Sequence, residues 1–352
     1  MIAVPAARRI AVVLFNLGGP DSLAAVEPFL KNLFSDPAII TLPGPLRWLV
    51  ARWIARRRAV TARGIYAKIE NRSPILPNTE AQAAALGEQL RDLGEVKVYC
   101  AMRYWHPMSD AVAAAVKSIA ADEIVLLPLY PQFSSTTTGS SYRAWIAAAA
   151  AAGLTAPTKL VCCYPTEAGF VAAAAELIRL SLAESAAKTS RPRRLLFSAH
   201  GLPKKIVKRG DPYPSQVGQS ARAIAAALGL ADSEWTVCFQ SRVGPLEWIG
   251  PYTDDEIRRA GRDGVAVVLF PIAFVSEHSE TLVELDIDYR HIADHSGVPS
   301  YVRVPTVGTT PAFIAGLAEL VRAAVASPAP VRSQVGRRLC AVGDGCCVNP
   351  VA

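Results

Sequence analysis

Six short, almost continuously apolar runs alternate with alanine-rich stretches along this chain, and this alternation limits the possible folds most strongly. The runs are IAVVLFN (10–16), VKVYCAM (96–102), EIVLLPLY (123–130), LLFSAH (195–200), WTVCFQ (235–240) and VAVVLFPIAFV (265–275). A strand without polar alternation is typical of a parallel sheet that helices cover on both faces. The pattern therefore predicts an α/β protein with doubly wound, Rossmann-like sheets.

The two halves of the sequence resemble each other weakly. LFNLGGP at 14–20 is echoed by LFSAHGLP at 196–203, and VLLPLYPQFSS at 125–135 by VVLFPIAFVSE at 267–277. We therefore expect two similar lobes, each with a parallel four-stranded sheet. The expected order is a first lobe (1–165), a second lobe (166–309), a C-terminal helix that packs back on the lobes (310–330) and a cysteine-rich tail (331–352).

The first half holds an insertion, here called the lip, over residues 35–77. Between its first two apolar runs it has about 40 residues more than the second half, where α/β connections usually hold one helix and short loops. Amphipathic helical spacing links Leu46, Leu49, Val50, Trp53 and Ile54. With its tryptophans and arginines, this helix suits a membrane headgroup region or the rim of an apolar ligand cleft. An ordinary core-facing helix is the alternative, because Arg57 falls inside the apolar arc.

Composition and charge exclude several classes of protein. With 352 residues, 51% of them hydrophobic, the chain can bury a large core. A net charge of +7 is mild, and no basic run with interleaved aromatic residues suggests a nucleic-acid groove. The first apolar run stops at Asn16, and no stretch approaches the roughly 18 apolar residues of a membrane span. Seven cysteines without a secretion signal argue against a disulfide framework. We expect a cytoplasmic protein, soluble or attached to the inner face of the membrane.

The fourth apolar run ends in His200, which Gly201 and Pro203 follow. In open α/β sheets, ligands bind just beyond the carboxyl ends of the strands. A neutral imidazole in that place can accept a proton or bind a metal ion. A histidine that only hydrogen-bonds the loop backbone is the simpler alternative.

An acidic segment, FVSEHSETLVELDIDYR (274–290), follows the last run, with Ser276 placed as a helix N-cap and His278 in the first turn. At helical spacing, one face carries Glu277, Glu280, Glu284 and Asp288. A solvated acidic face near a helix N-terminus would explain this row. However, the apolar lead-in places the helix start at the ligand-binding edge of the sheet. Acids and imidazoles that converge there would attract Fe²⁺ or Zn²⁺, or relay protons. We therefore expect His200 and this segment to meet in one cleft.

Two further strand exits carry aromatic and basic residues, in MRYWHP (102–107) and QSRVGPLEWIGP (240–251). A flat apolar pocket with a cationic edge can be lined by Arg103, Tyr104, Trp105, His106 and Trp248. The hydroxyl-rich loop QFSSTTTGSS (132–141) can hold anionic groups, although it lacks the ending of a P-loop. Because no GxGxxG occurs either, a nucleotide is not expected.

Taken together, several motifs resemble those of the ferrochelatases, the enzymes that complete haem synthesis. They are LFNLGGP, RYWHP, LYPQFSSTTTGSS, FSAHGLP with KRGDPYP downstream (208–214), FQSRVGPLEWIGP and PIAFVSEHSETLVELDIDY, in the family's order from about Ile10 to Val325. The resemblance implies a bacterial lyase of the chelatase type. Such an enzyme inserts Fe²⁺ into protoporphyrin IX between two α/β lobes and releases two pyrrole protons.

The resemblance also implies roles for single residues. His200 matches the family's histidine that accepts pyrrole protons or first binds the metal, and Glu280 matches its acidic partner, so these two would bind the Fe²⁺ substrate. His278 and Glu284 match further members of a polar path. Pocket residues near the macrocycle are matched by Arg103, Tyr104, Trp248 and Leu17.

The family uses an apolar lip to admit a porphyrin from the membrane surface, which implies a peripheral membrane contact through residues 39–58. Two alternatives stay open. A non-catalytic carrier of a metal or tetrapyrrole would use the same cleft as an enzyme. An enzyme for cobalt or coproporphyrin is also compatible with these side chains, because N/O sites rank divalent metals by availability as much as by affinity.

The tail sequence CAVGDGCCVNP places Cys340, Cys346 and Cys347 close together, which suggests a metal site that needs a fourth ligand. Several ferrochelatases carry a [2Fe-2S] cluster of this kind. In the animal enzymes the upstream cysteine lies in the hydroxyl-rich loop, where this chain has Ser135. The expected fourth ligand is therefore Cys162 or Cys163. Structural zinc or a tail without metal are the alternatives.

Overall fold

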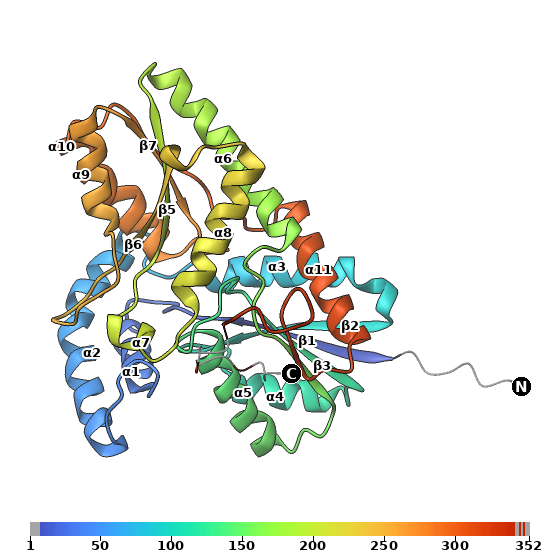
Figure 1. The fold of residues 1–352 in the computed structure, drawn as a ribbon. Helices are drawn as coiled ribbons and strands as arrows, with labels where there is room; N and C mark the ends of the chain where they lie inside the picture. Colours follow the sequence, from blue (N-terminus) through green and yellow to red (C-terminus); the bar gives the residue numbers. More distant parts are fainter. Residues whose placement is uncertain (1–7, 342–344, 346–347, 349–352) are drawn as a thin grey trace, which may run out of the picture.

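The computed structural model describes residues 8–341, 345 and 348, which form two parallel β-sheets, one above the other in Figure 1. The first sheet has the order β2-β1-β3-β4-β9 and consists of β1 (Arg9–Asn16), β2 (Glu95–Met102), β3 (Glu123–Pro128), β4 (Thr158–Val161) and β9 (Val331–Arg332). The second has the order β6-β5-β7-β8 and consists of β5 (Arg193–His200), β6 (Trp235–Gln240), β7 (Ala266–Pro271) and β8 (Tyr301–Arg303). The predicted α/β fold with two similar lobes is confirmed.

The prediction of four strands in the first sheet is wrong, because the sheet has five. The additional strand is β9, which follows the last helix and pairs with β4 through Leu160 and Val331. The first four strands share their order with the second sheet, in agreement with the internal repeat. The lobe limits of 1–165 and 166–309 stay a prediction.

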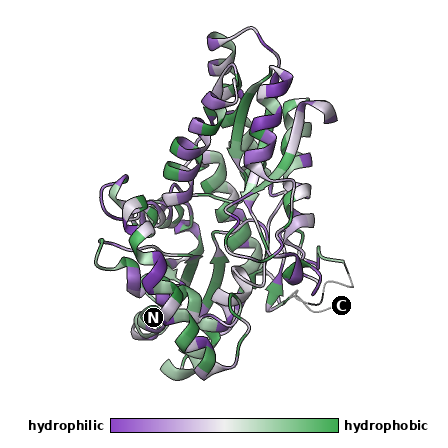
Figure 2. Ribbon diagram, turned by 90° about the vertical axis from the view of Figure 1, so that its left-hand side faces the viewer, coloured by the Kyte–Doolittle hydropathy of each residue, from purple (hydrophilic) through white to green (hydrophobic). Residues whose placement is uncertain are grey.

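Helices cover both sheets. In the first half they are α1 (Val26–Ser35), α2 (Gly44–Ala67), α3 (Ile75–Gln89), α4 (Ser109–Ser118) and α5 (Thr138–Ala152), with a 3₁₀ turn η1 (Arg91–Leu93). In the second half they are α6 (Ala168–Lys188), α7 (Lys204–Val207), α8 (Tyr213–Leu228), α9 (Thr253–Asp263), α10 (Tyr289–His295) and α11 (Pro311–Ala326), with a 3₁₀ turn η2 (Asp232–Glu234) and a π-helix η3 (Glu280–Asp288). Figure 2 shows that the hydrophobic residues concentrate in the strands beneath these helices.

One apolar core joins the two halves of the molecule. It includes Leu127 of the first sheet, Phe270 of the second sheet, and Phe170 of α6, which packs against Phe313 of α11 with ring centroids 6.2 Å apart. The two helices approach closely at Gly169, where a Cβ atom would lie 2.2 Å from the carbonyl oxygen of Ala312. The C-terminal helix α11 thus packs between the halves, and the shared core fixes how the strand ends of the two sheets face each other.

The lip contains α2, whose buried face differs from the expected one. Its buried side chains include Ala51, Ala55 and Ala59, which repeat every fourth residue and allow close packing against α1. The large apolar side chains point outward instead, with Leu49 57% and Trp53 59% exposed. The alternative that this apolar stripe faces the core is therefore wrong for Leu46, Leu49 and Trp53, whereas Val50 and Ile54 are half-buried. None of the helices in the described part of the chain is long and apolar enough to cross a membrane.

Candidate active site

His200 and Glu280 meet at the carboxyl edge of the second sheet. His200 is the last residue of β5, and Glu280 begins η3 shortly after the neighbouring strand β7 ends. Because β5 and β7 are parallel neighbours, their carboxyl ends open at the same edge. The Nδ1 atom of His200 donates a hydrogen bond to Oε2 of Glu280 over 2.9 Å. The structure thus brings together the two segments that the sequence singled out.

Ser241 connects two carboxylates of this site. It follows β6 directly in the left-handed conformation (φ 63°), which turns its backbone toward η3. Its backbone N–H donates to Oε1 of Glu284 over 2.9 Å, while its hydroxyl contacts both Glu284 and Glu280, the latter over 3.3 Å. Tyr289 donates a further hydrogen bond to Oε1 of Glu284 over 2.9 Å. The sequence analysis missed Ser241, although its place just beyond a buried strand is the same signal that pointed to His200.

The acidic segment does not begin as the sequence predicted. Ser276 is not a helix cap, because its hydroxyl is buried and donates to Oε1 of Gln82 on α3 over 2.9 Å. The helical part starts at Glu280 and is a π-helix, whose wider turn places Glu280 and Glu284 nearly one turn apart. Such helices are rare and occur often at functional sites. Glu280 and Glu284 thus lie on the same face of η3, and both carboxylates contact Ser241.

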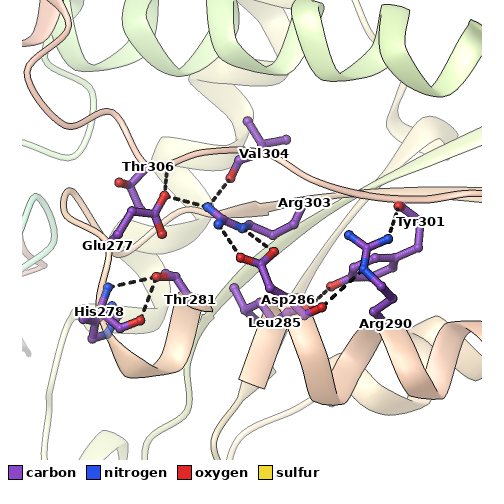
Figure 3. A network of polar contacts seen from close by, with 10 residues as sticks. All are labelled: Glu277, His278, Thr281, Leu285, Asp286, Arg290, Tyr301, Arg303, Val304 and Thr306. Carbon is purple, nitrogen blue, oxygen red and sulfur yellow. Dashed lines mark hydrogen bonds and ion pairs between the residues drawn. The ribbon is translucent and has the colours of Figure 1, made fainter. Parts of the chain in front are cut away.

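The acidic row also divides into two groups. Arg303 binds Oε1 of Glu277 over 2.6 Å and both carboxylate oxygens of Asp286 over 2.5 and 2.9 Å (Figure 3). The row predicted for Glu277, Glu280, Glu284 and Asp288 is thus wrong for Glu277. Burial alone would raise the pKa of Glu277, but the charge of Arg303, together with hydrogen bonds from Thr281, Thr306 and Arg303, outweighs burial and holds that pKa below its usual value. Glu280 and Glu284 are therefore the two acids of this row that lie at the carboxyl edge of the second sheet.

The ionisable groups at this edge have pKa values shifted in opposite directions. Burial alone would lower the pKa of His200, but the charge and hydrogen bond of Glu280, together with the charge of Glu284, outweigh burial and raise that pKa. Burial likewise opposes ionisation of Glu280, yet His200 lowers its pKa well below the usual value. Burial and then the charge of Glu280 raise the pKa of Glu284. These shifts favour an imidazolium–carboxylate pair of His200 and Glu280 beside Glu284, which takes up a proton more readily than an ordinary glutamate.

His278 lies near this pair in a different environment. Its side chain is buried, its ring centroid lies 4.5 Å from that of Phe274, and its Nδ1 atom has no hydrogen-bond partner among the described residues. Burial lowers the pKa of His278 more than the nearby Glu280 raises it, so the ring is neutral at neutral pH. A buried, unpartnered ring nitrogen is able to accept a proton or bind a ligand.

Of the expected pocket residues, Trp248 lies beside His200, with ring centroids 6.3 Å apart and an interplanar angle of 71°. Gly201 makes this approach possible, because a Cβ atom there would lie 3.1 Å from the indole. Arg103 and Tyr104 lie elsewhere, where both bind Oδ2 of Asp36 over 2.8 Å. Tyr104 is fully buried, and Leu17 packs in the same apolar cluster. Asp36, which the sequence analysis missed, thus ties the base of the lip to the exit of β2.

The model of the family described as ferrochelatase matches residues 9–325 of this chain. The chain belongs to the ferrochelatase family. The ferrochelatase of Caulobacter vibrioides is 52% identical over 335 residues, which cover 94% of this chain and 95% of that protein. The ferrochelatase of Phenylobacterium zucineum is 51% identical over 344 residues, or 96% and 97% of the two chains. The crystal structure of the sirohydrochlorin chelatase SirB from Bacillus subtilis subspecies spizizenii in complex with cobalt has a similar fold, with a TM-score of 0.52 and 11% identity over 91% of this chain and 97% of that one.

The described part of the tail brings Cys340 to two upstream cysteines. Pairing of β9 with β4 leads the chain past Cys162 and Cys163, whose sulfur atoms are 3.6 Å apart. Hydrogen bonding with Cys162 and with Cys340 raises the pKa of the Cys163 thiol. Gln216 donates a hydrogen bond from Nε2 to the sulfur of Cys340 over 3.3 Å. Cys346 and Cys347 lie outside the described residues, and within those residues no group of three or more potential ligands is arranged to hold a metal ion.

Proposed function

We propose that this protein is an enzyme, a ferrochelatase that inserts Fe²⁺ into protoporphyrin IX to form protohaem, the last step of haem synthesis. The single observation that carries the proposal is the hydrogen-bonded pair of His200 and Glu280, at a strand edge of a chain that belongs to this family. Insertion exchanges one Fe²⁺ for two pyrrole protons, so the site must bind a divalent ion and remove protons. An imidazole and two carboxylates supply both kinds of group.

We assign proton removal to a path from His200 through Glu280 to Glu284. His200 must first lose its proton, because only a neutral imidazole has a lone pair for a pyrrole proton or for Fe²⁺. The approach of Fe²⁺ to Glu280 favours this loss, since a dication competes with the imidazolium for the same carboxylate. Glu284, whose pKa is raised, is the acceptor beyond Glu280, and the hydroxyl of Ser241 contacts both carboxylates.

For the porphyrin, we propose entry along the lip. Residues 39–58 would lie at a membrane surface on the cytoplasmic side, where the exposed Trp48 and Trp53 of α2 suit the headgroup level. An arginine guanidinium lies over each of these rings, and that of Arg57 is 4.9 Å from the ring centroid of Trp53. The far end of the same helix reaches the site, since the hydroxyl of Tyr66 lies 3.5 Å from that of Ser279, next to Glu280.

We propose that Trp248 lines the porphyrin pocket beside His200 and that Leu17 lies at the rim of this pocket. The position of Trp248 next to the His200 ring supports its part. We propose that Arg103 and Tyr104 act indirectly, because their bonds to Asp36 hold the base of the lip in place. His278, neutral and near Glu280, is proposed as a further member of the polar path.

We also propose that Cys340, Cys346 and Cys347 hold a [2Fe-2S] cluster with Cys163 as the fourth ligand. The described residues supply part of this ligand set, Cys163 and Cys340, while Cys346 and Cys347 lie outside them. Cys163 contacts both Cys162 and Cys340, and the N–H of Gln216 points at the sulfur of Cys340. Hydrogen bonds to ligand sulfurs are typical of iron–sulfur sites. When bound, the cluster would supply a redox-active centre and would hold the tail in place. Zinc bound by the same thiols is the competing occupant.

The test is an anaerobic assay of purified protein with protoporphyrin IX and Fe²⁺ or Zn²⁺, followed by optical spectroscopy. We expect metal insertion much faster than in the protein-free control, and loss of turnover in His200→Ala. A carrier would show unaccelerated insertion, and its porphyrin affinity would survive that substitution. Parallel reactions with Co²⁺ and with coproporphyrin compare the metal and ring specificity. Equal rates with and without protein would refute the proposed function.

A further inference from the structure

Two of the five histidines of this chain form a pair on the outer surface of α10. His291 and His295 are four residues apart on this helix, and both are exposed. Residues at this spacing lie on the same helical face. Their ring centroids are 4.0 Å apart, with an interplanar angle of 47°. The two imidazoles are therefore already close enough to share one small ligand.

A hydrogen bond orients one of these rings as in a metal ligand. The Nδ1 atom of His295 lies 2.9 Å from the carbonyl oxygen of His291. A carbonyl oxygen only accepts, so Nδ1 carries the hydrogen and the lone pair of the neutral ring is on Nε2. Histidines that bind metals usually donate their other ring N–H to such an oxygen, which fixes both the tautomer and the ring direction.

The nearest cationic neighbour in the sequence is turned toward other groups. The guanidinium of Arg290 donates to the backbone oxygens of Asp286 and Tyr301 over 3.3 and 3.2 Å and lies 5.2 Å from the centroid of the Tyr301 ring. Between the two histidines in sequence stands Asp294, whose side chain is exposed. The bonds that Arg290 makes thus direct its exposed side chain toward Tyr301 of β8.

We propose that His291 and His295 form a surface site for one borderline divalent transition-metal ion, such as Ni²⁺, Zn²⁺ or Fe²⁺, with water as its remaining ligands. Imidazole nitrogen suits this class of ion and not Mg²⁺ or Ca²⁺. Because the described residues hold no group of three potential ligands, the site has two protein ligands and exchanges its ion readily. It lies at the outer end of the helical segment that begins with Glu280, in the α-helix α10 that follows the π-helix η3. It is thus a separate site, and it does not rest on the proposed function.

The test uses Ni²⁺ and the intact protein. In the unsubstituted protein, Ni²⁺ should protect His291 and His295 from modification by diethylpyrocarbonate, with the modified positions identified by mass spectrometry. In calorimetric titrations, His291→Ala and His295→Ala should each bind one Ni²⁺ fewer, or bind it at least about tenfold more weakly. Mg²⁺ should neither protect nor titrate. Unchanged modification of both histidines at saturating Ni²⁺ would overturn the proposal without any variant.

A matched control separates a chelating pair from two independent histidines. The double substitution His291→Ala with Asp294→His keeps two exposed histidines, now adjacent at 294 and 295. Adjacent residues on a helix do not face each other, so this variant should bind Ni²⁺ as weakly as His291→Ala alone. Binding equal to that of the unsubstituted protein would refute the shared site. Because the test measures Ni²⁺ at α10, its failure leaves porphyrin metalation unaffected.

Discussion

Replacing Glu280 with glutamine should move the ionisation of His200 to lower pH. In the unsubstituted protein, burial lowers the pKa of His200, and the charge and hydrogen bond of Glu280, with the charge of Glu284, together more than reverse this effect. Glutamine can still accept the hydrogen bond from Nδ1, but it removes the charge. Burial then dominates, and the pKa of His200 should fall below its ordinary value. If a neutral His200 is the base, the rising limb of kcat/KM against pH should shift to lower pH, with a maximum lower by about 10²-fold or more.

The same substitution should affect stability in a defined pH window. The raised pKa of His200 contributes stability below its unfolded pKa of about 6.5, and this contribution is lost as pH rises through the folded value. The lowered pKa of Glu280 contributes stability above its unfolded value of about 4.3, and this is lost as pH falls. Glu280→Gln should therefore cost most between about pH 5 and 6.5.

The size of this cost follows from the exposure of the pair. The His200 and Glu280 side chains are 38% and 25% exposed. Exposed pairs contribute up to about 1 kcal/mol, and breaking a fully buried pair costs about 3–5 kcal/mol. For this pair we expect about 1–2 kcal/mol of unfolding free energy, because solvent screens the attraction and the substitution also relieves repulsion with Glu284.

The assays are urea denaturation at several pH values and Zn²⁺ insertion from pH 5 to 9. Glu277→Gln is the matched control, since this acid stands three residues earlier and binds Arg303 instead. It should leave the rising limb of kcat/KM in place. A rising limb that stays in place or moves to higher pH in Glu280→Gln would refute the coupling between Glu280 and His200.

Three further predictions test other parts of the structure. Arg303→Met should lower the unfolding free energy by about 3–5 kcal/mol in urea, because two acids lose their shared partner. Ala55→Leu should destabilise by about 1–3 kcal/mol, whereas Trp53→Ala should change stability by less than about 0.5 kcal/mol, which tests by thermal denaturation which face of α2 packs. Cys163→Ser should abolish the visible absorption and the iron content of the proposed cluster, whereas Cys162→Ser should retain both; the reverse pattern would exchange the two ligands.

The longer strands could be predicted from the sequence because a strand that is buried on both faces consists almost entirely of apolar residues. Each of the six continuous apolar runs overlaps a strand of the two sheets, whereas the shorter strands β4, β8 and β9 lie outside these runs. The short strand β9 has no apolar run, since Val331 and Arg332 pair with β4 only after the chain has returned to the first sheet. A strand of two residues is specified by tertiary packing and not by local pattern.

The face of α2 was harder to predict, because two stripes on this helix have the same period. The large residues Leu46, Leu49 and Trp53 suggested the buried side, yet the alanines face α1. Periodicity locates a face but does not say which of two apolar faces meets the protein. In this helix the small side chains permit the closer approach, and the larger ones are left for another partner.

The acidic segment shows why the meeting of His200 and Glu280 could be predicted but its neighbours could not. Both residues follow buried parallel strands, and that rule needs no side-chain detail. The separation of Glu277 from Glu280 depends on Arg303, which the sequence places 26 residues away from Glu277. The contacts of Ser241 depend on one left-handed backbone position.

The division of the acids by Arg303 sets the charge of the site. If Glu277 and Asp286 had no cationic partner, their charges would add to those of Glu280 and Glu284 and hold further protons there. Arg303 binds both of these acids and offsets one of their two negative charges, so that only Glu280 and Glu284 face His200 at the strand edge. A divalent cation that displaces the proton of His200 brings two positive charges. Together with the carboxylates of Glu280 and Glu284, it forms a site that is close to electrically neutral. The environment that one arginine creates thus makes the remaining acids suitable for exchanging protons against a divalent metal ion.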